Sequence, residues 1–281
     1  MEDLIKKADV IIEALPYIQK YENKVIVVKY GGNIPADKLE SVARDIAALK
    51  GMGLRPLVVH GAGPQISEEM RKAKLEPKFV NGLRVTDKET VKIVEKVFAE
   101  MSSDIITLIK KYGEKGKAVS GSNDGVILAR MKDPALGFVG EIRKINPLYL
   151  KKLLRYDYVP VVSPLGIDTK GRIYNINADT AAAAIAGALK AEKLTVITNV
   201  DGVMENGKLH PTLTIRQANK KIKSGVISGG MIPKVEACIH AVKAGIPKAH
   251  LINGSVDHAL LIELFTQKGI GTEFVKKIER K

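Results

Sequence analysis

Short runs of apolar residues alternate along the chain with segments whose apolar residues recur every three or four positions. Residues 25–28 (Val-Ile-Val-Val) predict a buried strand, and residues 37–50 predict the amphipathic helix that follows it. The same alternation predicts further strands at residues 56–59, 126–129, 138–145, 159–162, 194–198 and 248–252. It predicts further helices from about residue 64 and at residues 86–112, 178–189, 215–223, 230–244 and 257–265.

This succession of elements indicates the fold class. Continuous β-branched strands between helices are typical of α/β proteins with a largely parallel sheet covered by helices on both faces. The helix at residues 86–112 is expected to start with Thr86 and Glu89 as a capping box. A chain of 281 residues can form one large domain or two lobes, and residues 166–171 are the best candidate for a seam between lobes.

The first twenty residues carry an amphipathic pattern of their own. An apolar stripe at helical spacing predicts a helix before the first strand, and it consists of Leu4, Ala8, Ile11, Ile12, Leu15 and Ile18. Pro16 is expected to kink this helix or to break it near Leu15. By the pattern alone, the simplest interpretation is a helix packed on its own domain.

Composition narrows the class of protein. A hydrophobic fraction of 45% and a charged fraction of 27% are ordinary for a globular protein. No stretch approaches the roughly 20 apolar residues of a membrane span, and the first residues do not resemble a signal peptide. We therefore expect a cytoplasmic protein without membrane contact. The single cysteine, Cys238, falls on the apolar side of a predicted helix and is interpreted as a buried thiol.

The net charge of +14 raises the question of nucleic-acid binding. The lysines are scattered along amphipathic segments, and aromatic residues, which would stack on bases, make up only 5% of the chain. This distribution favours attraction of small anionic molecules over binding of nucleic acid.

Two predicted strands end in motifs suited to a phosphoryl group. Residues 29–32 (Lys-Tyr-Gly-Gly) place an ammonium group and backbone N–H groups at the end of the first strand. Residues 60–64 (His-Gly-Ala-Gly-Pro) form a turn that opens a helix, where N–H groups also favour an anion. Neither motif fits the dinucleotide fingerprint or the Walker loop. Each motif taken alone is equally compatible with a plain tight turn.

Further along, polar residues recur at the ends of elements. Arg84 suits bidentate pairing with a carboxylate. Asn177 or Asp179 could cap the alanine-rich helix that follows. Residues 199–202 close a strand at the position where open α/β sheets bind ligands. Lys234 stands in the first turns of a helix behind Gly-Gly, where the helix dipole disfavours a cation unless an anion is bound.

These residues favour one reaction class. The sequence contains no Ser-His-Asp set, no cysteine nucleophile and no histidines at zinc-ligand spacing. Lysines behind glycine turns suit phosphoryl transfer, in which a protein mainly positions reactants and neutralises charge. A carboxylate acceptor needs no general base because it is ionised at neutral pH. The alternatives outside the enzyme class are an amino-acid sensor, which the paired lysines disfavour, and a basic nucleic-acid binder.

Five motifs occur in the order found in the N-acetylglutamate kinases, which belong to the amino acid kinase family, and nearly the whole chain resembles them. These motifs are residues 29–32, 60–64, 81–87, 174–179 and 229–234. The resemblance implies that Lys29 and Lys234 stabilise the transferring phosphoryl group and that Asp179 orients both lysines. It further implies that acetylglutamate is held by Gly61, Ala62, Arg84 and Asn175, and that phosphate and ATP are bound by Gly31, Gly32, Asn199, Val200, Asp201, Gly202, Gly229 and Gly230. Mg²⁺ is expected to arrive with ATP, without protein ligands of its own.

The family resemblance also implies an architecture: an open αβα sandwich with about eight mainly parallel strands. It divides the chain into an N-terminal interlacing helix (1–22), an N-lobe that binds the amino acid and dimerises (23–170), and a C-lobe that binds nucleotide (171–281). Two positions depart from the family pattern. Ala62 stands where glycine is usual, so its methyl group could narrow the approach to the phosphoryl group. Asn199 stands where aspartate is common, which weakens its assignment to the nucleotide site.

A second resemblance concerns regulation and assembly. Arginine-inhibited acetylglutamate kinases share a kinked N-terminal extension and an ending similar to residues 264–272. By this likeness, L-arginine is an expected inhibitor bound by Tyr17, His250, Glu263 and Gly269, and a hexamer (a trimer of dimers) is favoured over a homodimer. Within the enzyme class, the alternative is the carrier-protein-dependent aminoadipate or glutamate kinase of lysine or ornithine biosynthesis. That enzyme would need room for a longer substrate around Arg84.

Overall fold

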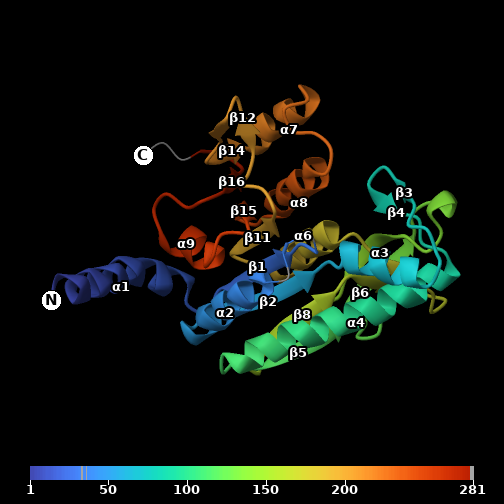
Figure 1. Cartoon of the computed structure of the whole chain (residues 1–281), viewed down its shortest axis with the longest axis horizontal. Helices are drawn as coiled ribbons and strands as arrows, with labels where there is room; N and C mark the ends of the chain where they lie inside the picture. Colours follow the sequence, from blue (N-terminus) through green and yellow to red (C-terminus); the bar gives the residue numbers. More distant parts are fainter. Residues whose placement is uncertain (33, 36, 279–281) are drawn as a thin grey trace.

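The computed structural model describes residues 1–32, 34, 35 and 37–278, except for the side chains of residues 2, 3, 6 and 7. Its centre is an eight-stranded sheet in the order β14-β16-β15-β11-β1-β2-β8-β5 (Figure 1). In that order the strands are Thr212–Thr214, Thr272–Val275, Lys248–Asn253, Lys193–Thr198, Val25–Tyr30, Arg55–His60, Val159–Ser163 and Gly116–Ser120. Neighbouring strands are parallel except β15 and β16, which confirms the predicted mainly parallel sheet.

Helices cover both faces of this sheet, as the alternating side chains of β1 require. Ile26 and Val28 pack on one face with α2 (Lys38–Gly51), α3 (Gly63–Lys72), α4 (Lys88–Lys111) and α9 (Ala259–Phe265). Val27 packs on the opposite face with α5 (Leu148–Arg155), α6 (Ala178–Leu189), α7 (Ile215–Lys223) and α8 (Met231–Lys243). The result is the predicted αβα sandwich. Cys238 is a buried thiol in α8, as predicted, and burial raises its pKa.

Two predicted strands are present but belong to a second sheet, which the sequence pattern did not indicate. The strands expected near residues 126–129 and 138–145 are β6 (Ile127–Met131) and β7 (Gly140–Ile145), but both lie outside the main sheet. They form a four-stranded sheet with β9 (Leu165–Ile167) and β10 (Ile173–Asn175). The elements not foreseen are all short: helix α5, the main-sheet strands β5, β14 and β16, the strands β9 and β10, the hairpins β3 (Phe79–Val80) with β4 (Leu83–Arg84) and β12 (Met204–Glu205) with β13 (Lys208–Leu209), and a 3₁₀ turn (Pro134–Leu136).

Two helix starts also needed correction. Asp87, not Thr86, caps α4, because its carboxylate accepts hydrogen bonds from the backbone N–H groups of Glu89 and Thr90. The hydroxyl of Thr86 is buried and donates to the carbonyl of Arg84 instead. Helix α9 starts two residues later than expected, since His258 takes a left-handed conformation with φ of 58°.

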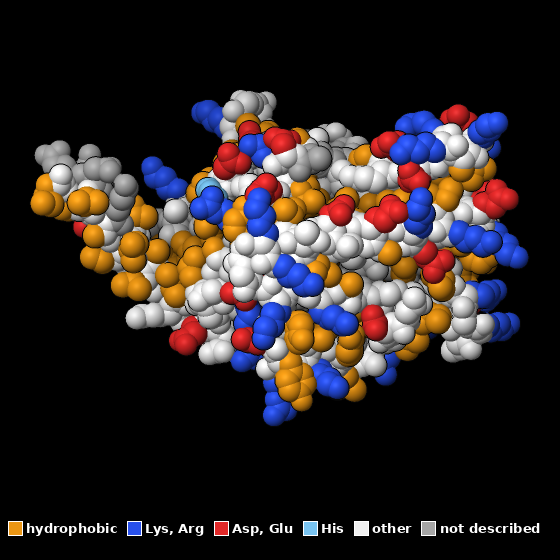
Figure 2. All heavy atoms as spheres, turned by 60° about the horizontal axis from the view of Figure 1, so that its bottom comes forward, with side chains coloured by type: hydrophobic (Ala, Val, Ile, Leu, Met, Phe, Trp, Pro, Cys, Tyr) orange, Lys and Arg blue, Asp and Glu red, His pale blue; other side chains and the backbone are white. Residues whose placement is uncertain are grey.

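The N-terminal helix α1 (Glu2–Tyr21) is continuous through Pro16, so of the two expected effects of this proline, a kink or a break, the break near Leu15 does not occur. Figure 1 shows α1 projecting from the body of the molecule. Its last turns pack on the core through Ala14, Tyr17 and Ile18. The preceding apolar residues are exposed, and Figure 2 shows this apolar face on the projecting helix: Leu4, Ile5, Val10, Ile11, Ile12 and Leu15. A helix packed wholly on its own domain is therefore not what the structure shows.

Residues 166–171, the expected seam between lobes, form the end of β9 and the turn that leads to β10. The division into lobes stays a prediction, and the last three residues of the expected C-lobe lie outside the described residues. None of the helices in the described part of the chain has the length and apolar character needed to cross a membrane.

Candidate active site

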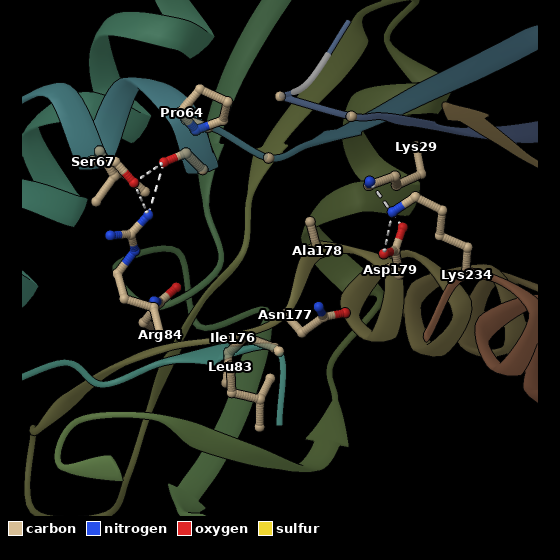
Figure 3. A pocket seen from close by; sticks show the side chains of 18 of the residues that line it. Lys29, Pro64, Ser67, Leu83, Arg84, Ile176, Asn177, Ala178, Asp179 and Lys234 are labelled. Carbon is tan, nitrogen blue, oxygen red and sulfur yellow. Dashed lines mark hydrogen bonds and ion pairs between the residues drawn. The ribbon is translucent and has the colours of Figure 1, made fainter. Parts of the chain in front are cut away.

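A cavity of about 440 Å³ opens at the carboxyl ends of β1, β2 and β11. Ligands bind at this edge in open α/β sheets, because the loops that leave parallel strands meet there. The structure brings nine predicted residues together in its lining: Lys29, Gly31, Gly32, Gly61, Ala62, Arg84, Asn175, Asp179 and Lys234. They come from segments far apart in sequence, from Lys29 at one end to Lys234 at the other (Figure 3).

Two lysines meet at one carboxylate. Nζ of Lys29 lies 2.8 Å from Oδ1 of Asp179, and Nζ of Lys234 lies 3.6 Å from Oδ2 of the same residue. Burial lowers the pKa of Lys29 more than Asp179 raises it. Burial alone would raise the pKa of Asp179, but the two lysines outweigh it and hold that pKa below its ordinary value. With one negative and two positive groups, the cluster favours an anion.

Asp179 is free to hold the lysines because a neighbouring residue caps α6. The side chain of Asn177 accepts the backbone N–H of Thr180 at 2.9 Å, which decides between the two capping candidates. Asp179 therefore projects from the first turn of the helix into the lysine pair (Figure 3).

Glycine is required where the two anion-binding turns touch. A Cβ on Gly32 would lie 2.9 Å from the backbone nitrogen of Gly63 and 3.1 Å from Cα of Ala62. A Cβ on Gly31 would lie 3.0 Å from the carbonyl oxygen of Ile197. The turns after β1 and β2 are thus in backbone contact, and their N–H groups share one end of the cavity. Ala62 is 1% exposed and belongs to the core cluster beneath the turn.

Arg84 is held against α3 at another side of the cavity (Figure 3). Its Nη2 donates to the carbonyl of Gly63 at 2.8 Å and to Oγ of Ser67 at 2.7 Å, and the guanidinium lies 4.7 Å from the ring centre of Phe79. Burial, assisted by Arg71, lowers the pKa of Arg84, although a guanidinium stays charged. Within the described residues no carboxylate pairs with it. A ligand carboxylate therefore suits this position.

Several residues in the lining were not predicted from the sequence. Ser67, Phe79, Phe98, Val139, Ile176 and Thr198 all contribute to the cavity. Ile176 lies within the motif at residues 174–179 and Thr198 directly precedes residues 199–202, but no role was assigned to either. The other four belong to none of the five motifs, and their only sequence signal was the position of Ser67 one turn after the Gly-Ala-Gly segment. Asn175, which was predicted, donates to Oγ1 of Thr86 at 3.3 Å.

Of the residues predicted to bind phosphate and ATP, Gly31 and Gly32 line this cavity and the other six lie outside its lining. Asn199, Val200, Asp201 and Gly202 follow β11, whose last residue, Thr198, reaches the lining. The carboxylate of Asp201 accepts a hydrogen bond from Asn253 at 2.7 Å. The remaining pair, Gly229 and Gly230, precedes α8 and the lysine that it carries. The assignment of these six residues to ATP stays a prediction.

The four residues expected to bind arginine line a second cavity, of about 420 Å³: Tyr17, His250, Glu263 and Gly269. The carboxylate of Glu263 pairs with His250 and accepts the backbone N–H groups of Ile270 at 2.7 Å and Gly271 at 3.1 Å. Lys193 lines the same cavity, and burial lowers its pKa to about 8. This cavity holds both signs of charge, as an amino-acid ligand would require.

Comparison with known proteins defines the class. A model described as the amino acid kinase family matches residues 24–253, so the chain belongs to the amino acid kinase family and is a phosphotransferase. In particular, it is 45% identical to an acetylglutamate kinase of Methanocaldococcus jannaschii, over 97% of each chain. It is also 45% identical to an acetylglutamate kinase of a Sulfurihydrogenibium species, over 97% of this chain and 99% of the relative. The resemblance drawn from the five motifs is confirmed.

A longer protein of known structure shares the fold. The N-acetylglutamate synthase of Neisseria gonorrhoeae, complexed with coenzyme A and N-acetyl-glutamate, superimposes with a TM-score of 0.86 at 26% identity. The match covers 97% of this chain, but this chain spans only 64% of that longer one.

Proposed function

We propose that the protein transfers the γ-phosphoryl group of MgATP to the side-chain carboxylate of N-acetyl-L-glutamate. The products are N-acetyl-L-glutamyl 5-phosphate and ADP, which makes this the second step of arginine (ornithine) biosynthesis. The observation that carries the proposal is the meeting of Lys29 and Lys234 at Asp179, in the same cavity as the guanidinium of Arg84. The curated relatives, named as acetylglutamate kinases, support the choice of substrate.

In the proposed reaction, an oxygen of the acceptor carboxylate attacks the γ-phosphorus and the bond to the bridging β–γ oxygen breaks. No proton has to be removed, because the carboxylate is ionised at neutral pH. Lys29 and Lys234 neutralise the charge that spreads over the phosphoryl oxygens, while Asp179 holds their ammonium groups in position. Arg84 and Asn175 bind the two ends of the rest of the substrate.

Nucleotide is assigned to the C-lobe (171–281) and the amino acid to the N-lobe (23–170). The loop at residues 199–202 starts where Thr198 leaves the cavity, and residues 229 and 230 lead into the helix of Lys234. We propose that these two segments surround ATP on the side of the lysine pair. Mg²⁺ enters as part of the substrate MgATP and is held chiefly by its phosphates.

A coupled assay of ADP release tests the proposal against its closest rival. The purified protein is incubated with MgATP and either N-acetylglutamate or N-acetyl-α-aminoadipate. We expect turnover of the glutamate derivative to exceed that of its longer homologue. Inactivity with acetylglutamate would remove the proposed function and favour a carrier-bound substrate.

We also propose that L-arginine inhibits the enzyme by binding in the second cavity. Support comes from the gathering of Tyr17, His250, Glu263 and Gly269 around it. The buried carboxylate of Glu263 suits a guanidinium, and Lys193 suits the carboxylate of an amino acid.

The substitution Gly269→Ala is expected to weaken arginine inhibition about tenfold or more. Gly269 has φ of +59°, and a Cβ there would lie 2.6 Å from Oε2 of Glu263, so the carboxylate would be displaced. The measurement is the arginine concentration that halves the rate of ADP release. Gly225→Ala is the matched control, because Gly225 also has a positive φ (+78°) but nothing within 4 Å of its Cβ position. An unaltered arginine response in a folded Gly269→Ala protein would count against this site.

The exposed apolar face of α1 supports the proposed hexamer, in which this helix interlaces homodimers. Ile11 is 63% exposed and Leu15 is 44% exposed, which is unfavourable unless another chain covers them. The double substitution Ile11→Glu and Leu15→Glu is expected to convert a hexamer to a dimer in light scattering coupled to gel filtration. Asp9→Lys changes the charge of the same helix away from the stripe and should leave the mass unchanged. A dimeric mass for the unmodified protein would refute the proposed assembly.

A further inference from the structure

The guanidinium of Arg84 is fixed by contacts with the protein itself. Three of these contacts come from α3, and two of them are made by Nη2: the carbonyl of Gly63 at 2.8 Å and Oγ of Ser67 at 2.7 Å. Nη1 donates to the sulfur of Met70 at 3.2 Å, and the ring of Phe79 lies beside the guanidinium plane at 4.7 Å. Figure 3 shows the side chains of Ser67 and Arg84 pointing toward each other at one side of the cavity.

The same helix is tied to the phosphoryl side of the cavity. Helix α3 starts at Gly63, directly after the turn formed by Gly61 and Ala62, and that turn touches the Gly32 turn that follows Lys29. Ile66 and Met70 bury the inner face of α3 in the core, so the helix cannot slide freely. One rigid element therefore relates the position of Arg84 to that of the lysine pair.

We propose that Ser67 is a positioning residue that sets which length of dicarboxylate the enzyme accepts. This inference rests on the proposed function. The hydroxyl of Ser67 donates to the carbonyl of Gly63 at 3.0 Å while it accepts from Arg84, so it closes a triangle of hydrogen bonds around Nη2. Without that hydroxyl, the guanidinium loses one of its three hydrogen bonds to α3 and keeps Gly63 at Nη2 and the weak sulfur acceptor of Met70 at Nη1, so it is held less firmly.

The position of the guanidinium matters because the proposed substrate spans the cavity. One carboxylate of an N-acyl dicarboxylate binds Arg84, and the other must reach the phosphoryl group held at Lys29 and Lys234. N-acetylaspartate, N-acetylglutamate and N-acetyl-α-aminoadipate differ from one another by one methylene group. A misplacement of about 1 Å at the reacting centre can cost on the order of 100-fold in rate. A fixed guanidinium therefore selects one of the three lengths, and a mobile one selects less sharply.

The test compares Ser67→Ala with the unmodified enzyme on these three substrates, by kcat and KM for ADP release and by Kd from calorimetry. In Ser67→Ala we expect KM and Kd for acetylglutamate to rise about tenfold, as for the loss of a hydrogen bond to a charged group. We expect kcat at saturation to change little and the preference for acetylglutamate over its two homologues to narrow about tenfold. Ser67→Thr keeps the hydroxyl and is expected to restore both values. Glu68→Ala, an exposed neighbour on α3, serves as the control.

Two outcomes would overturn the role of Ser67. One is an unchanged preference among the three substrates in a folded Ser67→Ala protein. The other is an equal loss of kcat on all three, since a merely structural residue would act in that way. If the unmodified protein turns over none of the three, the proposed function fails by itself. The calorimetric preference among the same ligands then still decides whether Ser67 sets the length that is bound.

Discussion

Replacement of Lys234 by alanine is expected to lower kcat by roughly 100-fold or more and to change KM for acetylglutamate much less. The ammonium of Lys234 lies at the open side of the cluster, with 21% of its side chain exposed, so the variant should fold. Charge on the phosphoryl oxygens spreads as the bond to ADP breaks, and a cation at that point stabilises the transition state more than the ground state. Initial rates of ADP release at saturating MgATP and acetylglutamate give kcat directly.

Lys243→Ala is the matched control for this prediction. Lys243 lies on the same helix but in its last, exposed turn, so its loss removes a charge of the same sign far from the cavity. We expect its kcat to equal that of the unmodified enzyme. If Lys234→Ala kept a normal kcat and only raised KM for MgATP, Lys234 would bind nucleotide without taking part in the chemical step.

The lysine cluster could be predicted from the sequence chiefly because its residues stand in motifs that resemble those of the N-acetylglutamate kinases. Position alone pointed to Lys234, because a cation at the positive end of a helix is unfavourable unless an anion is bound. The spacing of apolar residues predicted the strands and helices that carry them, since both periods follow from backbone geometry. Lys29, Asp179 and Lys234 line one cavity because the parallel strands bring their carboxyl ends to one edge of the sheet.

Other features depend on contacts that no local pattern contains. Alternating residues identified β6 and β7 as strands, but strand partners are chosen by tertiary packing, so their separate sheet was not foreseen. The late start of α9 follows from His258, whose ring bonds the buried carboxylate of Asp45 at 2.7 Å. The role of Ser67 could not be predicted either, because it depends on a tertiary contact: the β3–β4 hairpin brings Arg84 against α3.

Removal of the shared carboxylate, Asp179→Asn, is expected to lower the free energy of unfolding at pH 7 by about 3 kcal/mol. Only 5% of the Asp179 side chain and 5% of the Lys29 side chain are exposed, so the variant leaves a buried ammonium without its counter-charge. Urea unfolding followed by circular dichroism gives this value. Asp157→Asn is the control, because that carboxylate pairs with Lys50 while 78% exposed and should contribute little.

The pH dependence of this loss distinguishes an unpaired charge from a simple packing defect. In the folded protein, burial holds the pKa of Lys29 below its ordinary value of 10.5, and loss of Asp179 lowers that pKa further. As the pH rises toward 10.5, the folded variant releases the proton while the unfolded chain still binds it, so the free energy of unfolding of Asp179→Asn increases. The difference from the unmodified protein should therefore shrink between pH 7 and pH 9.5. A difference that stays constant over this range would mean that the buried ammonium is not the source of the destabilisation.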